Sequence, residues 1–365
     1  MVLLFFILIL LCFLSYSFVL IDPNITLFNH QLWAIARDKL VQFGYFHRDI
    51  STLVYIVLVM ALFVLHLFFI KNFKKYDPVK VAFIAGSILL LSYPFLSRDF
   101  FNYIFDARII THYGKNPYFY RPLDFPTDHW LRFMNWVHRT YPYGPIFLPL
   151  TLIPSFLAFG KFILNYIFFK GLSVFFYIIG VYFLKKSSKR TALIFATSPL
   201  VIIEGLVSSH NDIIAVSLAF IGIYFLLNKK SSIWARVFFL LSGGIKYITL
   251  PLVFLRSKKN SRLNLLVLVG VSALVVGASL KLGIQPWYFL NLLVLLPFYE
   301  SFISKLNLLF CGLLLSYYPF IRYGDWKKIE IKNGIILVAI SLNLLYLLLL
   351  YIRGGRKADF LANAS

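Results

Sequence analysis

Runs of close to 20 apolar residues recur along the whole chain of 365 residues, and they constrain its architecture more than any other feature. At 1.5 Å of rise per residue, a helix of that length crosses about 30 Å of hydrocarbon. Only 14% of the residues are charged, whereas a soluble domain carries about 25%. The sequence therefore predicts an all-α polytopic membrane protein, multi-pass and integral to the bilayer, with about 9–11 transmembrane or re-entrant helices.

The net charge of +22 comes from basic residues that lie in short clusters between the apolar runs. Clusters of this kind mark cytoplasmic loops. A nucleic-acid partner is not expected, because no soluble scaffold would present a basic groove. The clusters are Lys71, Lys74, Lys75 and Lys80; Lys185, Lys186, Lys189 and Arg190; Lys229 and Lys230; and Arg256, Lys258, Lys259 and Arg262.

The acidic residues are distributed differently. Half of the 14 lie in two stretches on the side opposite the basic clusters. The two cysteines lie inside apolar runs, so neither a disulfide framework nor a thiolate metal site is expected. The seven acids are Asp22, Asp38 and Asp49 in the first stretch, and Asp99, Asp106, Asp124 and Asp128 in the second.

The chain is predicted to form one membrane domain, 1–365. Within 22–50, apolar residues recur at spacings of three and four from Leu27 to Phe43, which predicts an external helix lying in the membrane interface. Residues 97–145 form a large first external loop region, and 144–159 form a re-entrant segment that contains three prolines. Other helices are expected near 51–70, 81–96, 161–184, 191–208, 213–227, 263–280, 287–299, 303–320 and 333–352, with a hairpin of short helices over 233–255.

Asp99, Tyr103 and Asp106 follow one another at spacings of four and three, so a helix that begins at about Arg98 would place them on one face. The arrangement offers a carboxylate with a second carboxylate and a phenol beside it, and Asp99 is the first candidate for a base that takes a proton from a hydroxyl group. The structural alternative is that Asp99 only caps the helix and that Asp106 pairs with Arg108 or with another basic residue at the surface.

Three cations, Arg98, Arg108 and Lys246, are available to hold a departing phosphate. Arginine suits phosphate because of its fork of donors. Lys246 would act as a point charge on a lipid phosphate, or it would only anchor the hairpin at the interface.

Further polar residues lie near an expected outer turn. His210, Asn211 and Asp212 occupy the turn itself, although Asp212 could be a simple helix cap. Glu204 lies in an apolar context, where an ionisable group faces a partner or a cavity. Asp99 with Asp106 or Asp212 could hold Mg²⁺ or Mn²⁺ through oxygen ligands, but no spacing requires a metal.

An ordered set of short motifs resembles the GT-C superfamily of polyprenyl-phosphate-sugar-dependent glycosyltransferases, in particular the catalytic subunits of GPI mannosyltransferase I and their prokaryotic relatives. The resemblance covers about 95–255 and makes 146–255 the core helices of a GT-C-like bundle, with 256–365 as C-terminal helices. Arg98 precedes Asp99 where the family often has a second acid. The motifs are Asp99 with Tyr103, Gly114-Lys115-Asn116-Pro117-Tyr118, Tyr143-Gly144-Pro145, Gly160-Lys161-Phe162, Ser198-Pro199-Leu200, His210-Asn211-Asp212 and Ile245-Lys246-Tyr247.

The resemblance implies an inverting hexosyltransferase, most simply a mannosyltransferase, that uses a polyprenyl-phosphate donor and a glycolipid or glycan acceptor at the extracytoplasmic face. It implies Asp99 as the catalytic residue, and it also implies a small membrane partner subunit. The alternative function is a transporter or flippase of a lipid-linked sugar, although such proteins tend to have internal repeats. The substrate-binding residues expected beside Asp99 are Arg98, Tyr103, Asp106, Arg108, Asn116, Tyr118, Tyr143, Glu204, His210, Asn211, Asp212 and Lys246.

Overall fold

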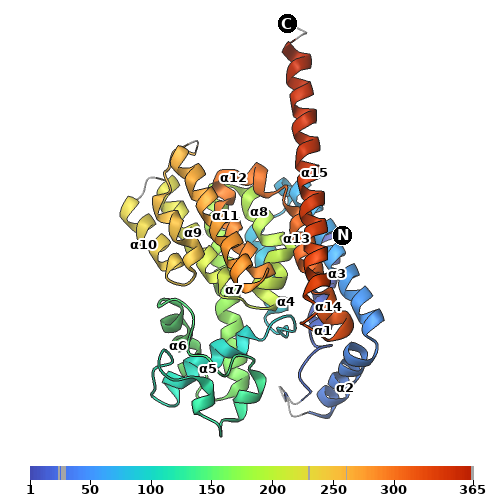
Figure 1. Cartoon of the computed structure of the whole chain (residues 1–365), viewed down its shortest axis with the longest axis vertical. Helices are drawn as coiled ribbons and strands as arrows, with labels where there is room; N and C mark the ends of the chain where they lie inside the picture. The colour runs from blue at the N-terminus through green and yellow to red at the C-terminus, as the bar shows by residue number, and fades with distance from the viewer. Residues whose placement is uncertain (24, 26–29, 229–230, 260, 363–365) are drawn as a thin grey trace.

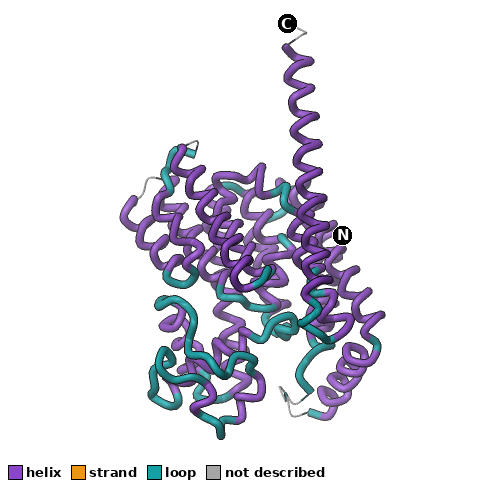
Figure 2. Tube along the Cα trace, viewed as in Figure 1, coloured by secondary structure: helices purple, strands orange, loops and turns teal. Residues whose placement is uncertain are grey.

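The computed structural model describes residues 1–23, 25, 30–228, 231–259 and 261–362, and within these ranges it is helical and contains no strand. The predicted all-α class is therefore confirmed, as Figures 1 and 2 show. The predictions made for residues 27–29 and for Lys229 and Lys230 lie outside the described residues.

Five described helical segments are long and apolar enough to cross a membrane, and a bent helix pair makes a sixth candidate. The chain is therefore an integral, multi-pass membrane protein. The five are α3 (Arg48–Lys71), α7 (Phe162–Ser187), α11 (Arg262–Leu282), the continuous η6 (Pro286–Leu295) and α12 (Leu296–Ile303), and α15 (Ile329–Ala362) over Ile329–Arg353. Shorter apolar helices are α1 (Val2–Ser17), α4 (Pro78–Leu89), α6 (Phe147–Leu157), α9 (Asp212–Leu227) and α10 (Ser232–Gly243).

The molecule has a helical bundle and, below it in Figure 1, a smaller lobe in which most of the long loops gather (Figure 2). The lobe contains α5 (Asp99–Thr111), the loop that follows it, and α6. The predicted external loop region is therefore a folded unit. Short helices within it are η2 (Pro122–Asp124) and η3 (His129–Phe133).

The predicted interfacial helix is α2 (Gln31–Phe46), which lies beside α1 and α3 at the lobe end of the bundle (Figure 1). At the other end of the bundle, η1 (Phe73–Lys75) leads into α4. This helix begins where Asp77 accepts hydrogen bonds from two backbone amides and Pro78 takes the first helical position. Lys185, at the end of α7, pairs with Asp77, so two of the predicted basic clusters meet there.

The predicted single helix over 191–208 is wrong. α8 (Lys189–Thr197) stops, and a π-helix, η4 (Val201–Val207), continues at an angle of 65° to it. Pro199 accounts for the break, because proline has no amide hydrogen and forces the preceding Ser198 into extended backbone, with ψ at 122°. The bend brings Glu204 and the turn after it to the centre of the bundle, where they are fully buried.

The predicted helix over 303–320 is also wrong, because it is divided into α13 (Asn307–Leu315) and α14 (Tyr318–Tyr323). Pro319 lies in the first turn of α14, where its missing amide hydrogen costs nothing. The helix predicted over 81–96 ends earlier, at Leu89, shortly before Pro94. In each case a proline lies near the point where the helix ends or is interrupted, although the apolar run of the sequence continues past it.

The predicted hairpin over 233–255 consists of α10 and η5 (Tyr247–Phe254). Its tip touches the lobe, where the backbone amide of Ile146 donates to the carbonyl of Gly244 at 3.1 Å. A Cβ atom on Gly144 would lie 2.0 Å from that carbonyl oxygen, so only glycine allows this approach. The contact fixes the hairpin, and with it Lys246, against the lobe.

Candidate functional site

Polar side chains gather where the lobe meets the bundle, and Asp99 lies among them. The residue is the first of α5, whose predicted start at Arg98 is confirmed, and its backbone amide donates to Ser97 Oγ at 3.2 Å. The carboxylate itself does not cap the helix. Its Oδ1 accepts a hydrogen bond from Trp136 Nε1 at 3.0 Å, and the side chain is 15% exposed.

Burial raises the pKa of the Asp99 carboxyl above its usual value, and the charges of Lys246 and Arg139 partly oppose that shift. The hydrogen bond from Trp136 also lowers this pKa, whereas the charge of Asp212 raises it. A carboxylate with a raised pKa is a stronger base than an ordinary aspartate. The environment of Asp99 thus favours proton transfer to it.

Tyr103 and Asp106 lie on the same face of α5, as their spacing predicts, and both are buried. The Tyr103 ring meets the edges of Tyr143 and Phe147, with centroids 5.1 and 5.0 Å apart. Burial raises the pKa of Asp106 to about 8, the charge of Arg139 lowers it, and the charge of Asp99 adds to the rise. Asp106 is therefore largely protonated near neutral pH.

The raised pKa of Asp106 predicts a dependence of stability on pH. Because the folded chain binds this proton more tightly than the unfolded chain, the free energy of unfolding should fall as pH rises from about 4 to about 8. The slope for one proton is about 1.4 kcal/mol per pH unit at most. In the Asp106→Asn variant, the melting temperature measured by intrinsic fluorescence in detergent should change less with pH over this range. A variant that melts with the same pH dependence as the wild type would contradict the assignment.

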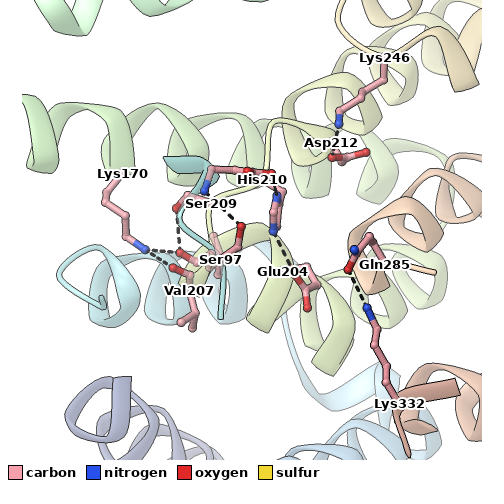
Figure 3. A network of polar contacts seen from close by, with 12 residues as sticks. Ser97, Lys170, Glu204, Val207, Ser209, His210, Asp212, Lys246, Gln285 and Lys332 are labelled. Carbon is pink, nitrogen blue, oxygen red and sulfur yellow. Dashed lines mark hydrogen bonds and ion pairs between the residues drawn. The ribbon is translucent and has the colours of Figure 1, made fainter. Parts of the chain in front are cut away.

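The turn between η4 and α9 forms the wall opposite Asp99. His210 Nδ1 lies 3.9 Å from Asp99 Oδ2. On its other side, His210 Nε2 lies 3.4 Å from Glu204 Oε2, as Figure 3 shows. The imidazole stacks on Trp287 at a centroid distance of 4.1 Å. His210 thus lies between two carboxyl groups, with its ring plane fixed by an indole.

Asp212 holds Lys246 at 2.9 Å, as Figure 3 shows, and accepts a hydrogen bond from Asn291 at 2.7 Å. Asp212 is fully buried and is the first residue of α9, so it does not have the simple N-cap role. Lys246 also lies over the Tyr143 ring, 5.8 Å from its centroid. Its ammonium is therefore held inside the site and does not reach out to the interface.

Asn211 is 1% exposed, and within the described part of the chain neither atom of its side-chain amide has a hydrogen-bond partner. Oδ1 of Asn102 and Oδ1 of Asn291 are buried in the same way. A buried amide left unpaired is costly, so such groups usually have a partner in the working state of a protein. Neutral donors and acceptors of this kind match the hydroxyl groups of a sugar.

A buried lysine supports the turn. Lys170, on α7, is fully buried, and its ammonium donates to Ser92 Oγ and to the carbonyl of Leu206. It also donates to the carbonyl of Val207, as Figure 3 shows. These carbonyls end the π-helix and precede Ser209, whose φ is 54°. Left-handed backbone is rare outside glycine, so the surroundings must impose it. Lys170 therefore holds the segment that presents His210, Asn211 and Asp212.

Four predicted site residues lie away from this group. Arg98 pairs with Asp22 at 3.9 Å. Arg108 follows Asp99 by nine residues, which places it on the opposite side of the helix, and it pairs with Asp128 at 2.6 Å rather than with Asp106. Asn116 accepts from the amide of Tyr118 within a turn, and the Tyr118 ring packs on Tyr141.

The sequence did not single out four residues that belong to the site: Trp136, Arg139, Trp287 and Asn291. Trp287 lies at the start of a predicted helix, where an aromatic residue is expected because such residues are enriched at membrane interfaces. An asparagine in the apolar run after Pro286 was the one usable signal for Asn291. Arg139, whose guanidinium lies 4.5 Å from the Trp136 ring centroid, is one of many basic residues.

Asp99, Asp106 and Asp212 were considered above as ligands of Mg²⁺ or Mn²⁺. Among the described residues, no group of three or more His, Cys, Asp or Glu side chains has an arrangement that could hold a metal ion. The site itself places two cations near the carboxylates, Lys246 beside Asp212 and Arg139, whose charge acts on Asp99 and Asp106.

Comparison with known proteins identifies the family of the chain. A family model, described as alpha-(1->6)-mannopyranosyltransferase, N-terminal domain, of the MptA/B family, matches residues 26–257, which is more than half of the chain. The match includes Asp99, the turn at His210 and Lys246, and it ends before Trp287 and Asn291. No protein with a curated description and no solved structure matches the chain.

Proposed function

Because the chain belongs to the MptA/B family of α-(1→6)-mannopyranosyltransferases, which move mannose from polyprenyl-phosphate mannose to a glycan acceptor, we propose that Asp99 is the base of that transfer. The observation that carries the proposal is the position of Asp99. Its carboxylate is buried and has a raised pKa. Across the junction of lobe and bundle, it faces the turn that carries the unpaired side-chain amide of Asn211 and the ion pair between Lys246 and Asp212.

In the proposed step, Asp99 takes the proton of the acceptor hydroxyl as the acceptor oxygen forms a bond to the anomeric carbon of mannose. The bond between that carbon and the phosphate oxygen breaks, and its electron pair leaves with the polyprenyl phosphate. Lys246 stabilises the negative charge that develops there. Because the acceptor attacks from the side opposite the phosphate, the configuration at the anomeric carbon is inverted.

The sugar would lie between α5 and the turn that joins η4 to α9, against Asn211, Tyr103 and Tyr143. The amide of Asn211 supplies both a donor and an acceptor, and the two rings form an apolar surface that is rigid because they pack edge to face. Asp106, held protonated by burial, adds a hydrogen-bond donor near neutral pH. Each of these groups is neutral, as a hexose is.

Replacing Lys246 by methionine tests the phosphate role. The variant should raise KM for polyprenyl-phosphate mannose and lower kcat, with a combined loss in kcat/KM of about 10²-fold, because one stabilising charge is removed. Steady-state transfer of radiolabelled mannose in nanodiscs measures both constants. Lys281→Met, at an exposed position on α11, is the matched control. Unchanged donor kinetics in the Lys246 variant would exclude this role.

The site is proposed to face the outside of the cytoplasm. The lobe packs on the Phe162 end of α7, whereas Lys185, Lys186 and Arg190 lie at or just beyond its other end, about 39 Å away along the 26-residue helix. Basic residues stay on the cytoplasmic side. A cysteine introduced at the exposed Phe119 of the lobe should react with a membrane-impermeant maleimide in intact cells, and one at Lys186 should not.

The acceptor is a glycan, and by its resemblance to the GPI mannosyltransferase I subunits the enzyme would use a glycolipid and a small membrane partner subunit. Incubating the purified protein with polyprenyl-phosphate mannose and lipid-linked or free oligomannosides tests these points together. A product heavier by one hexose, found by mass spectrometry with the purified chain alone, would establish the transfer. A requirement for an added membrane fraction would support a partner, and no product under either condition would overturn the proposed function.

A further inference from the structure

A cavity of about 260 Å³ lies on the side of α5 that faces away from Asp99. Arg108, Thr111 and Trp130 line it from α5 and the loop that follows, and Ser155, Phe159 and Asn165 line it from α6, its end and the start of α7. The cavity shares no lining residue with the site around Asp99, and it is separated from that site by the thickness of a helix.

The floor of the cavity contains an incompletely bonded amide. Asn165 is 2% exposed, and its Nδ2 donates to the carbonyl of Lys161 at 3.2 Å. Its Oδ1 is buried, and no group in the described chain hydrogen-bonds to it. Beside it, the hydroxyls of Thr111 and Ser155 lie 2.8 Å apart, so one of the two donates to the other and the second proton remains for another acceptor.

The charge of the cavity is balanced. Arg108 donates from Nε to Asp128, and its guanidinium lies 3.9 Å from the ring centroid of Trp130. The Asp128 carboxylate is nearly fully buried and also accepts from the Tyr113 hydroxyl, which keeps the ion pair in place. An anion would have to compete with this carboxylate, whereas a neutral molecule rich in hydroxyl groups finds donors and acceptors with no charge to displace.

An aromatic side chain stands at the mouth. Phe159 is 81% exposed and has a φ of 49°, which is unusual for a bulky residue. Gly160 follows, with a φ of 72°, and the two left-handed residues hold the ring beside the opening of the cavity. An exposed aromatic face beside neutral polar groups is an arrangement that suits a sugar ring, whose carbon-bound hydrogens pack on aromatic rings while its hydroxyls form hydrogen bonds.

We propose that this cavity binds a sugar residue of the glycan acceptor that is remote from the reacting end. The inference rests on the proposed function, because it takes Asp99 as the place where the acceptor hydroxyl reacts. Asp99 and Thr111 are twelve residues apart on α5, which is about 18 Å along the helix. A glycan that occupies both places must pass around the helix, so only acceptors several sugars long reach the cavity. The second site would thus select for chain length.

The test compares short and long acceptors. Phe159→Ala changes an exposed side chain and should fold, and Asn165→Leu replaces the floor amide by a side chain of similar size. Each variant should raise KM for a long α-oligomannoside about threefold to tenfold, the effect of one lost contact. KM for a methyl mannoside acceptor and KM for the polyprenyl-phosphate mannose donor should not change. Phe83→Ala, which removes an exposed phenylalanine from α4, is the matched control.

Equilibrium binding of an α-mannotetraose to the detergent-solubilised protein, with no donor present, provides a measurement that does not depend on catalysis. Weaker binding to the Phe159→Ala variant than to the wild type would support the inference even if transfer failed. Equal KM values for long acceptors, with equal binding, would overturn it. A rise confined to KM for the donor would assign the cavity to the lipid phosphate, and this result would also overturn the inference. Failure of the wild type to transfer mannose to any acceptor would count against the proposed function alone.

Discussion

Asp99→Asn should lower kcat for mannose transfer by about 10³-fold, the contribution expected of a well-placed general base. The amide keeps the size of the side chain and can still accept the hydrogen bond from Trp136 Nε1, so the fold and the substrate sites should remain. What is lost is the ability to take a proton from the acceptor hydroxyl. Single-turnover transfer from radiolabelled donor in nanodiscs measures the chemical step separately from substrate binding.

The control for this variant is Asp124→Asn. Asp124 lies in the same lobe and pairs with Arg121 at the surface, so its replacement should leave kcat within about twofold of the wild type. The pH profile adds a second readout, because wild-type transfer should fall as pH decreases through the raised pKa of Asp99. An Asp99→Asn enzyme that retains full activity would remove this residue from the chemistry.

Lys170→Met should lower the free energy of unfolding by about 3–5 kcal/mol, since three buried oxygen atoms lose their donor at once. The same change should reduce transfer, because the carbonyls of Leu206 and Val207 are no longer tied to α7 and the turn at His210 is free to move. Thermal unfolding followed by tryptophan fluorescence gives the stability. Activity measured well below the melting temperature gives the effect on the site.

Lys161→Met provides the comparison, because this lysine lies one residue before the same helix and is exposed. The Lys161→Met variant should have the same melting temperature as the wild type. A Lys170→Met protein that is less stable but fully active when folded would show that the lysine supports the bundle without positioning the turn. A Lys170→Met protein with the melting temperature of the wild type would contradict the hydrogen-bonding role itself.

The sequence predicted the helical class and one wall of the site, for physical reasons that apply residue by residue. Apolar length identifies spans such as α3 and α7, because a bilayer requires it. The spacing of Asp99, Tyr103 and Asp106 is a property of one helix, so it can be read before the fold is known. Pro199 and Pro319 limited the prediction, since each interrupts a run that hydropathy alone treats as continuous.

The opposite wall could be predicted only in part. Lys246 and Asp212 were each expected to belong to the site, but their pairing depends on how the hairpin packs against α9, and no local pattern encodes it. Asn291 lies 79 residues beyond Asp212 along the chain, so only the tertiary structure shows that they touch. Arg108 shows the converse. Its charge suggested a role in phosphate binding, but its position on α5 places it at the cavity on the side of the helix that faces away from Asp99.

The contact between Gly144 and the carbonyl of Gly244 determines how the two halves of the site are assembled. The proposed base, Asp99, belongs to the lobe and Lys246 belongs to the hairpin, and the chain between Gly144 and Gly244 is about a hundred residues long. Backbone packed directly on backbone has no side chain that could adjust by changing rotamer. The separation between the proposed proton acceptor, Asp99, and the proposed phosphate-stabilising charge, Lys246, therefore depends on this main-chain contact, and an alanine at residue 144 would widen it.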